Sequence, residues 1–192
     1  MQKTSFRRKR IALFGGKFDP PHLGHQLTIF LCLEKFGMEK VWLIPSAAHP
    51  FGHRMSPFAL RFAMCRLLAL PWRGRGKVRL LDDERRLAAR PVYTIDLVRH
   101  LKEKYGDHDY HLVIGEDNWN ARAEWKEFDE LSKLVTPLVI GRGAASAIDL
   151  ALPGISSTAI REAIAQGAPW EHLVPAGVSD FLRKQDLYRP TD

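Results

Sequence analysis

The chain has 192 residues, 45% of them hydrophobic and 10% aromatic, and a formal net charge of +7 at pH 7. This length suits one well-buried domain and is short for two, and the apolar content excludes an intrinsically disordered chain. Five of the positive charges lie in the first ten residues, which contain no acid, so the remainder is nearly balanced and a broad nucleic-acid-binding face is not required.

The basic segment at the start is expected to be a solvated arm over residues 1–9, followed by one folded domain over residues 10–192. Cys32 and Cys65 are the only cysteines, and both lie in apolar runs without a CxxC pattern, which is typical of buried, reduced thiols. No apolar stretch has the length of a signal-peptide core or a membrane span. The sequence therefore predicts a cytoplasmic protein that binds neither nucleic acid nor a membrane.

Apolar runs alternate with longer helical patterns from residue 10 onward, which indicates βαβ units around a parallel sheet. The expected strands span residues 11–14, 41–45, 77–81, 110–114 and 134–140, with a short sixth strand at 148–152 as an option. The expected helices span residues 22–36, 57–70, 93–105, 125–131, 156–165 and 178–187. Residues 46–55 and 82–90 are expected to be polar and charged connections. The pattern predicts a single doubly wound, Rossmann-like α/β domain with a mostly parallel sheet of five to six strands and a ligand crevice at the strands' carboxyl ends.

The connection between the first strand and the first helix, GGKFDPPHLGH at residues 15–25, most needs a functional explanation. His22 and His25 are three residues apart, which places both side chains on one helix face. Gly24 between them lets a ligand approach the backbone, and the free N–H groups of a helix start favour phosphate. Histidines near a helix start can also be solvated cap residues. The strand, double glycine, loop and helix together favour a phosphate site with two imidazoles.

Two later segments also follow expected strands, namely residues 115–117 and 156–161, and should meet the first segment at the same sheet edge. The second begins with Ser-Ser-Thr and has Arg161 one turn further on, and the guanidinium fork matches phosphate oxygens. Alone, this segment would be interpreted as a helix cap with a surface arginine. Together, helix starts, imidazoles and a guanidinium without a nucleophile suit phosphoryl or nucleotidyl transfer, which depends on positioning and charge neutralisation.

Other site types have less support. Neither GxxxxGK(S/T) nor GxGxxG is present, which disfavours P-loop and dinucleotide sites. A zinc site of four histidines without cysteine would be uncommon, so no metal-ligating residues are expected; the histidines that it would need are His22, His25, His49 and His53. Asp82, Asp83 and Glu84 are expected to be a solvated run. Four tryptophans are expected in the core or at its rim: Trp42, Trp72, Trp119 and Trp170.

The ordered motifs resemble those of bacterial nicotinate-nucleotide adenylyltransferases, in the nucleotidyltransferase superfamily marked by HxGH. Residues 15–25 resemble the family's GG(T/S)FDPxHxGH, and Tyr-Thr-Ile-Asp at 93–96 resembles (S/T)YT(I/V)DTL. Ile-Gly-Glu-Asp at 114–117 with Trp-Lys at 125–126 is similar to IGxD…W, and ISSTAIR at 155–161 to ISST-x-IR. The ending at residues 182–188 is similar too. HxGH alone marks only the superfamily, whereas the combination is specific.

The resemblance implies transfer of the adenylyl group from ATP to nicotinate mononucleotide, giving deamido-NAD and pyrophosphate, with Mg²⁺ accompanying ATP. The implied catalytic residues are His22, His25 and Arg161. The implied ATP-binding residues are Gly15, Gly16, Lys17, Phe18, Gly24, Gly115, Asp117, Ser156, Ser157 and Thr158. The implied mononucleotide-binding residues are His49, His53, Tyr93, Thr94 and Trp125.

The chain departs from the family pattern at two places. Lys17 stands where the family has Thr or Ser, and His49-Pro-Phe-Gly-His53 stands where it commonly has Pro-Pro-His-Lys. Two alternatives therefore stay open: adenylyl transfer to nicotinamide mononucleotide or another phosphate acceptor, and a non-catalytic nucleotide-binding homologue. The sequence does not determine the oligomeric state.

Overall fold

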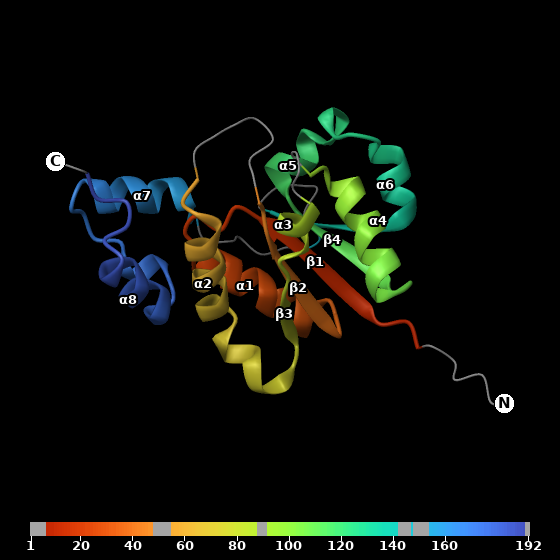
Figure 1. Ribbon diagram of the computed structural model, residues 1–192, viewed down its shortest axis with the longest axis horizontal. Coiled ribbons are helices and arrows are strands. Elements are labelled where there is room, and N and C mark those ends of the chain that lie inside the picture. The colour runs from red at the N-terminus through yellow and green to blue at the C-terminus, as the bar shows by residue number, and fades with distance from the viewer. Residues whose placement is uncertain (1–6, 48–54, 88–91, 142–146, 148–153, 191–192) are drawn as a thin grey trace.

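Five parallel strands form one sheet within the part of the chain that the computed structural model describes (Figure 1). The described residues are 7–47, 55–87, 92–141, 147 and 154–190. The strands are β1 (Arg10–Gly16), β2 (Lys40–Pro45), β3 (Val78–Leu80), β4 (Asp109–Gly115) and β5 (Thr136–Ile140). Their order in the sheet is β3-β2-β1-β4-β5, which confirms the predicted doubly wound α/β fold.

Helices occupy the connections, as the alternating pattern predicts. The α-helices are α1 (Leu23–Phe30), α2 (Phe58–Leu68), α3 (Asp83–Leu87), α4 (Thr94–Tyr105), α5 (Glu116–Asn120), α6 (Phe128–Leu134), α7 (Ser157–Ala165) and α8 (Ala176–Lys184). The short segments of other helix types are the π-helical η1 (Leu31–Lys35) and the 3₁₀-helical η2 (Leu70–Arg75), η3 (Arg122–Glu124) and η4 (Glu171–Leu173).

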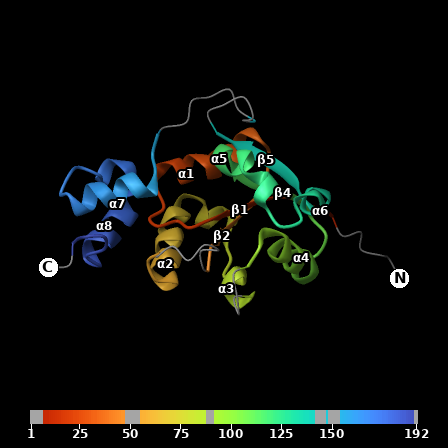
Figure 2. The ribbon, with the colours of Figure 1, turned by 90° about the horizontal axis from the view of Figure 1, so that it is seen from above.

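Successive side chains of β1 face opposite sides of the sheet, and helices cover both sides. Ala12 and Phe14 belong to a buried cluster with residues of α1, η1 and α2, whereas Ile11 and Leu13 belong to one with residues of α4 and α6. A third cluster joins α7 and α8 to Met64 of α2. The C-terminal helices therefore stand at one end of the sheet, beside α2, as Figure 2 shows from above.

The two central strands stop pairing before they end. β1 pairs with β4 only up to Leu13 and Leu112, while it stays paired with β2 through Gly16. The prediction that this strand ends at Phe14 was therefore wrong, because β2 continues to supply hydrogen-bond partners through Gly16. Beyond Leu13, β1 and β4 diverge at the point where the strand order reverses, which is where ligands bind in open α/β sheets.

Several predicted boundaries need correction. His22 is the N-cap of α1 rather than its first residue, and the helix changes to π geometry at Leu31. The helix predicted at 125–131 begins only at Phe128, because Trp125 has extended backbone, and α6 continues to Leu134. The last helix begins at Ala176, where Pro175 precedes it. The optional strand at 148–152 lies outside the described residues.

Asp83 and Glu84, at the start of α3, are buried, so the prediction of a solvated run was wrong for these two residues, whereas Asp82 is partly exposed. Asp83 is 1% exposed and accepts hydrogen bonds from Tyr105, 3.0 Å away, and from Lys104, and it lies 3.0 Å from His100. Glu84 is 8% exposed and accepts the Ala47 N–H at 2.9 Å. These partners compensate the burial of the carboxylates, and they join α3 to α4 and to the end of β2.

The Glu84 carboxyl should make stability depend on pH. Burial raises its pKa from 4.5 to about 7, against the lowering effects of the Ala47 N–H and Arg61. The folded protein therefore binds more protons than the unfolded chain between these pH values, and it loses stability as the pH rises from about 4.5 to 7.

Glu84→Gln should remove this loss, because glutamine keeps an oxygen for the Ala47 N–H and does not titrate. Relative to wild type, the variant should gain about 2–3 kcal/mol in free energy of unfolding between pH 5 and 8, measured by urea denaturation. Asp82→Asn is the control, since that side chain is 38% exposed; it should change the difference by about 0.5 kcal/mol at most. Equal pH dependence in Glu84→Gln and wild type would mean that Glu84 is not the titrating group.

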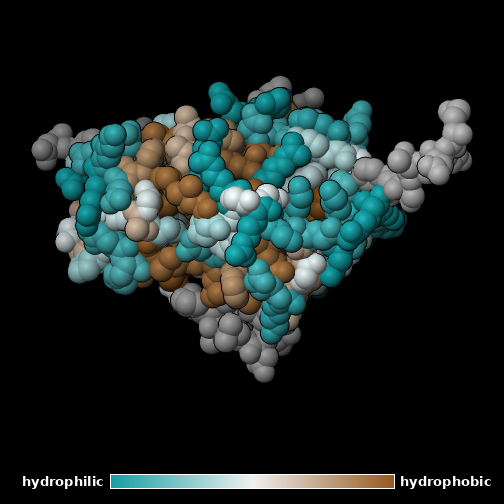
Figure 3. Space-filling view, turned by 90° about the horizontal axis from the view of Figure 1, so that it is seen from below, coloured by the Kyte–Doolittle hydropathy of each residue, from teal (hydrophilic) through white to brown (hydrophobic). Residues whose placement is uncertain are grey.

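The predicted burial of the cysteines and of three tryptophans is confirmed. Both cysteines are buried and unpaired, and Trp42, Trp72 and Trp170 are buried, as predicted. Apolar side chains gather between hydrophilic ones on the face in Figure 3, which is ordinary for a globular surface. None of the helices in the described ranges is long and apolar enough to cross a membrane.

Candidate active site

The loop between β1 and α1 is compact and largely buried. Phe18 has a positive φ of 49° and is 1% exposed; its ring packs on Phe14 and on His25, with centroids 5.4 and 4.9 Å apart. A Cβ on Gly16 would lie 3.3 Å from the Phe18 ring, which explains the glycine. The Phe18 ring therefore supports His25, so the predicted ATP contact of this residue could be made only by its main chain.

The two histidines at the start of α1 form a close, tilted ring pair. Their ring centroids are 3.7 Å apart with an interplanar angle of 34°, and the His22 N–H donates to Nδ1 of His25 at 3.1 Å. Because Nδ1 of His25 accepts this bond, the proton of the neutral ring is on Nε2. His25 thus satisfies one of the helix's free N–H groups and keeps one N–H donor for a ligand.

The His22 ring leaves little room for a side chain at position 24. A Cβ at this position would lie 3.0 Å from both Cε1 and Nδ1 of the His22 ring. The expectation that glycine there admits a ligand is therefore incomplete, because its absent side chain also makes room for His22.

Burial keeps both imidazoles neutral. It lowers the pKa of His22 to about 4, and it lowers the pKa of His25 well below 6.5, with a further lowering by His22. At neutral pH the pair can therefore donate hydrogen bonds but contributes no positive charge of its own. A bound polyphosphate would favour the charged form of the imidazoles by its negative charge.

The start of α7 meets the β1–α1 loop, as the sequence predicts for segments that follow parallel strands. The Ser157 hydroxyl donates to the carbonyl of Pro20 at 2.8 Å, and Nη1 of Arg161 donates to the carbonyl of Asp19 at 2.7 Å. Ser156 caps α7 by accepting the Ala159 N–H at 3.1 Å. The Ser157 hydroxyl has thus already donated its hydrogen, and Oγ1 of Thr158 accepts a hydrogen bond from Nη2 of Arg161 at 3.3 Å. The hydroxyl hydrogens of Ser156 and Thr158, the helix N–H groups and the remaining Arg161 donors could still bind a phosphate.

The other predicted ATP contacts lie at the same sheet edge. Gly115 ends β4 and caps α5, and Asp117 is exposed in the first turn of α5. Lys17 is also exposed; its carbonyl accepts a hydrogen bond from Arg61 at 2.8 Å. No contact joins the side chains of Lys17 or Asp117 to the histidine pair in the described structure.

The predicted mononucleotide residues form a second group. Tyr93 is the N-cap of α4, which begins at Thr94, and its side chain is 48% exposed. Lys126 has its Nζ 4.8 Å from the Tyr93 ring centroid. Trp125 packs edge-on against Phe128, with centroids 6.1 Å apart. His49 and His53 lie outside the described residues.

Residues 13–163 match the profile of the cytidylyltransferase-like family. The chain is also 38% identical, over 94% of its length and 97% of the relative's, to a probable nicotinate-nucleotide adenylyltransferase of Anaeromyxobacter sp. (strain K). It belongs to the nicotinate-nucleotide adenylyltransferase family. A Myxococcus xanthus (strain DK1622) protein of the same name is 34% identical, with 93% of this chain and 94% of that one covered.

Solved structures agree with this adenylyltransferase family. A Vibrio parahaemolyticus protein with the same provisional name has a TM-score of 0.76 at 27% identity, covering 95% of this chain and 97% of that one. The nicotinic acid mononucleotide adenylyltransferase of Plasmodium falciparum, complexed with NaAD, has a TM-score of 0.79, covering 94% of this chain and 98% of that one. At 18% identity, the second likeness is one of fold.

The sequence did not predict three residues that support the site of this adenylyltransferase. Asp19 lies in the β1–α1 loop, and Arg61 and Tyr188 are bonded to this loop from distant segments, at Lys17 and Asp19. Only Asp19 lies in a recognised site motif, and the burial of Arg61 inside α2 had no local signal. The similarity of the ending at 182–188 to the family was the one indication for Tyr188.

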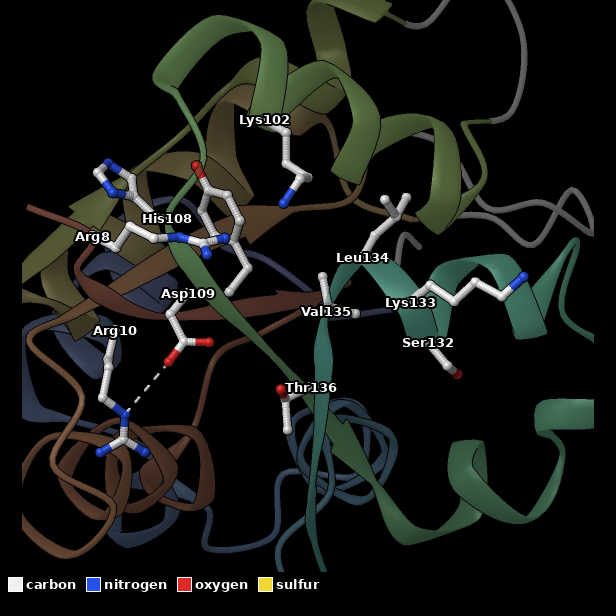
Figure 4. A pocket seen from close by; sticks show the side chains of 11 residues that line it. Arg8, Arg10, Lys102, His108, Asp109, Ser132, Lys133, Leu134, Val135 and Thr136 are labelled. Atoms are coloured by element: carbon white, nitrogen blue, oxygen red, sulfur yellow. Dashed lines mark ion pairs between the residues drawn. The ribbon is translucent and has the colours of Figure 1, made fainter. Parts of the chain in front are cut away.

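Two hollows lie away from the predicted site. The first, of about 480 Å³, lies at the amino ends of β1, β4 and β5 (Figure 4). Its cations Arg8 and Lys102 pair with Asp107, at 2.6 and 2.5 Å, so the adenylyltransferase family's anionic substrates find few free partners there. The second, of about 570 Å³, lies among α7, η4 and α8. The candidate site therefore rests on the convergence at the carboxyl edge rather than on a hollow.

Proposed function

We propose that the protein transfers the adenylyl group of ATP to nicotinate mononucleotide, forming deamido-NAD and pyrophosphate in NAD biosynthesis. The main support for this function is a pair of hydrogen bonds. Ser157 and Arg161 of α7 donate to the carbonyls of Pro20 and Asp19, which shortly precede the histidine pair. Two helix starts and a guanidinium thereby meet at the switch point of the sheet. This arrangement supports binding of a triphosphate.

In the proposed reaction, a phosphate oxygen of the mononucleotide attacks the α-phosphorus of ATP. The new bond forms as the bond from the α-phosphorus to the oxygen that bridges to the β-phosphate breaks, and pyrophosphate leaves. His22 and His25 donate hydrogen bonds to the α-phosphoryl oxygens, where charge develops, while Thr158, Arg161 and the α7 N–H groups hold the β- and γ-phosphates. The protein supplies no nucleophile, so catalysis is positioning and electrostatic stabilisation.

We propose that Mg²⁺ enters bound to ATP. The described residues contain no group of three or more His, Cys, Asp and Glu side chains that could hold a metal ion. This suits Mg²⁺, which keeps several waters and is commonly held by substrate phosphates with one or two carboxylates. The ion would neutralise charge on the leaving pyrophosphate.

The mononucleotide is proposed to bind at the start of α4. The free N–H groups near Thr94 would meet the nicotinate carboxylate, and Trp125 would stack on the electron-poor pyridine ring. Asp117 would approach a ribose, and His49 and His53 would complete this part of the site. An acid would be distinguished from an amide because N–H donors cannot pair with the amide NH₂.

Trp125→Ala should raise the KM for nicotinate mononucleotide roughly tenfold with little change in kcat, because stacking contributes about 1–3 kcal/mol and acts on ground and transition states alike. Trp119→Ala is the matched control, since that ring also packs on Phe128, at 5.9 Å. Steady-state kinetics with saturating ATP separates the two parameters. If both variants raise KM equally, loss of support for Phe128 explains the effect and Trp125 is not a stacking residue.

Pyrophosphate release tests the function as a whole. Purified protein is incubated with ATP, Mg²⁺ and either nicotinate mononucleotide, nicotinamide mononucleotide or pantetheine phosphate. We expect the highest kcat/KM with the nicotinate. A preference for another acceptor would reassign the substrate, and no pyrophosphate with any of them would favour a non-catalytic nucleotide-binding protein.

A further inference from the structure

Asp19 is a buried junction between the β1–α1 loop and the end of the chain. It is 5% exposed, and its carboxylate accepts the Ser56 N–H at 3.0 Å and the Tyr188 hydroxyl at 2.5 Å. Its carbonyl accepts the bond from Arg161. One residue thus connects three segments that are distant in sequence, directly before the histidine pair.

Arg61 holds the same loop from α2. Its side chain is among the largest that are fully buried, and its Nε and Nη1 donate to the carbonyls of Ser56 and Lys17, each at 2.8 Å. The guanidinium therefore binds both segments that the hydrogen bond between Asp19 and the Ser56 N–H joins. Lysine could not reproduce two directed bonds from one planar group.

The backbone at both ends of the Asp19–Tyr188 contact is unusual. Phe18 and Tyr188 have φ angles of 49° and 66°, which place two bulky residues in the left-handed region. Such conformations persist where surrounding contacts over-determine them, and they cluster at functional sites. The contact with Tyr188 supplies this restraint across 169 positions of sequence.

We propose that Arg61 and Tyr188 are positioning residues for adenylyl transfer. Tyr188, through the Asp19 carboxylate, and Arg61, through the carbonyls of Lys17 and Ser56, hold the loop that orients His22 and Arg161. This inference rests on the proposed function. Neither side chain is assigned a contact with substrate. Tyr188 remains a donor because burial, followed by its hydrogen bond to Asp19, raises its pKa. Its loss leaves a buried carboxylate with one donor fewer.

Tyr188→Phe tests the proposal against Tyr110→Phe. Tyr110 is 2% exposed, and its hydroxyl donates to the Gly106 carbonyl at 2.9 Å, at the amino end of β4. Tyr110→Phe loses this bond, and Tyr188→Phe loses the bond to Asp19 and the side-chain hydrogen bond with Ser56, so both should lower Tm, by about 2–4 °C or more. Only Tyr188→Phe should lower kcat, by about fivefold, with the KM for the mononucleotide unchanged. Equal kcat values in the two variants would overturn the proposal.

Amide hydrogen exchange provides a readout that does not need activity. Tyr188→Phe should speed exchange at residues 17–26 relative to wild type, while Tyr110→Phe should not. If wild type forms no pyrophosphate, the proposed function fails, yet this comparison still decides whether Tyr188 holds the loop. Unchanged exchange would refute that role.

A second pair of variants tests α2, even if Tyr188→Phe does not fold. Arg61→Lys should lower kcat more than Arg66→Lys, whose side chain lies exposed on the same helix, over the Phe62 ring at 5.3 Å. The KM for the mononucleotide should be the same in both. Equal kcat values would remove Arg61 from the positioning group.

Discussion

Replacing His25 with alanine is expected to lower kcat by at least ~10²-fold, as when a preorganised donor to the developing charge is removed. The His22 N–H fixes Nδ1 of His25 as an acceptor, so Nε2–H is the donor available to the α-phosphoryl group. The same change removes the cap on the His22 N–H, at about 1 kcal/mol. Pyrophosphate release at saturating substrates, with urea denaturation in parallel, separates the catalytic loss from the smaller loss of stability.

His100→Ala is the control for this experiment. That imidazole is also partly buried, and its Nε2 lies 3.0 Å from the Asp83 carboxylate. It belongs to α4 and not to the β1–α1 loop. It should retain nearly normal kcat despite a comparable loss of stability. A near-normal kcat in His25→Ala would remove His25 from the catalytic residues.

Gly24→Ala should lower kcat roughly 10- to 100-fold, because small displacements of a catalytic group can cost this much. The new methyl group would lie 3.0 Å from the His22 ring, which would have to move away from His25. Alanine is otherwise favoured over glycine in a helix, so the free energy of unfolding should change little while activity falls. Steady-state kinetics and urea denaturation measure the two effects.

Gly177 offers a close match for comparison. Like Gly24 it is the second residue of its helix, but a Cβ there would meet only Leu67, at 3.6 Å. Gly177→Ala should therefore keep wild-type kcat and gain up to about 1 kcal/mol in stability. If Gly24→Ala is equally active, the His22 ring tolerates the methyl group and its position is not critical.

Local patterns predicted most of the fold. Strand runs, helix periodicity and the Ser156 cap depend on neighbouring residues, so the parallel sheet and the meeting of residues 15–25 with 156–161 followed from them. The continuation of β1 through Gly16 depends instead on pairing with β2. In a single segment, two glycines indicate the end of a strand. Here the strand continues through them because the backbone of β2 pairs with it, which the local sequence does not show.

The polar interior was harder to predict. Asp83 and Glu84 look like surface residues until Lys104 and the Ala47 N–H are known to be their partners. Likewise, Arg61 lies in an apolar helix pattern, and nothing nearby in sequence indicates a role. Buried charges are stabilised by specific partners from other elements, which periodicity does not reveal.

The contact between Asp19 and Tyr188 also joins two segments that are synthesised at different times. The strands and the histidine pair are all synthesised before residue 188. The sheet can therefore form while the β1–α1 loop still lacks its hydrogen bond from Tyr188 to Asp19. Closing a contact over so many residues costs loop entropy. We therefore expect a released chain that ends before Tyr188 to keep the sheet but to have a lower kcat.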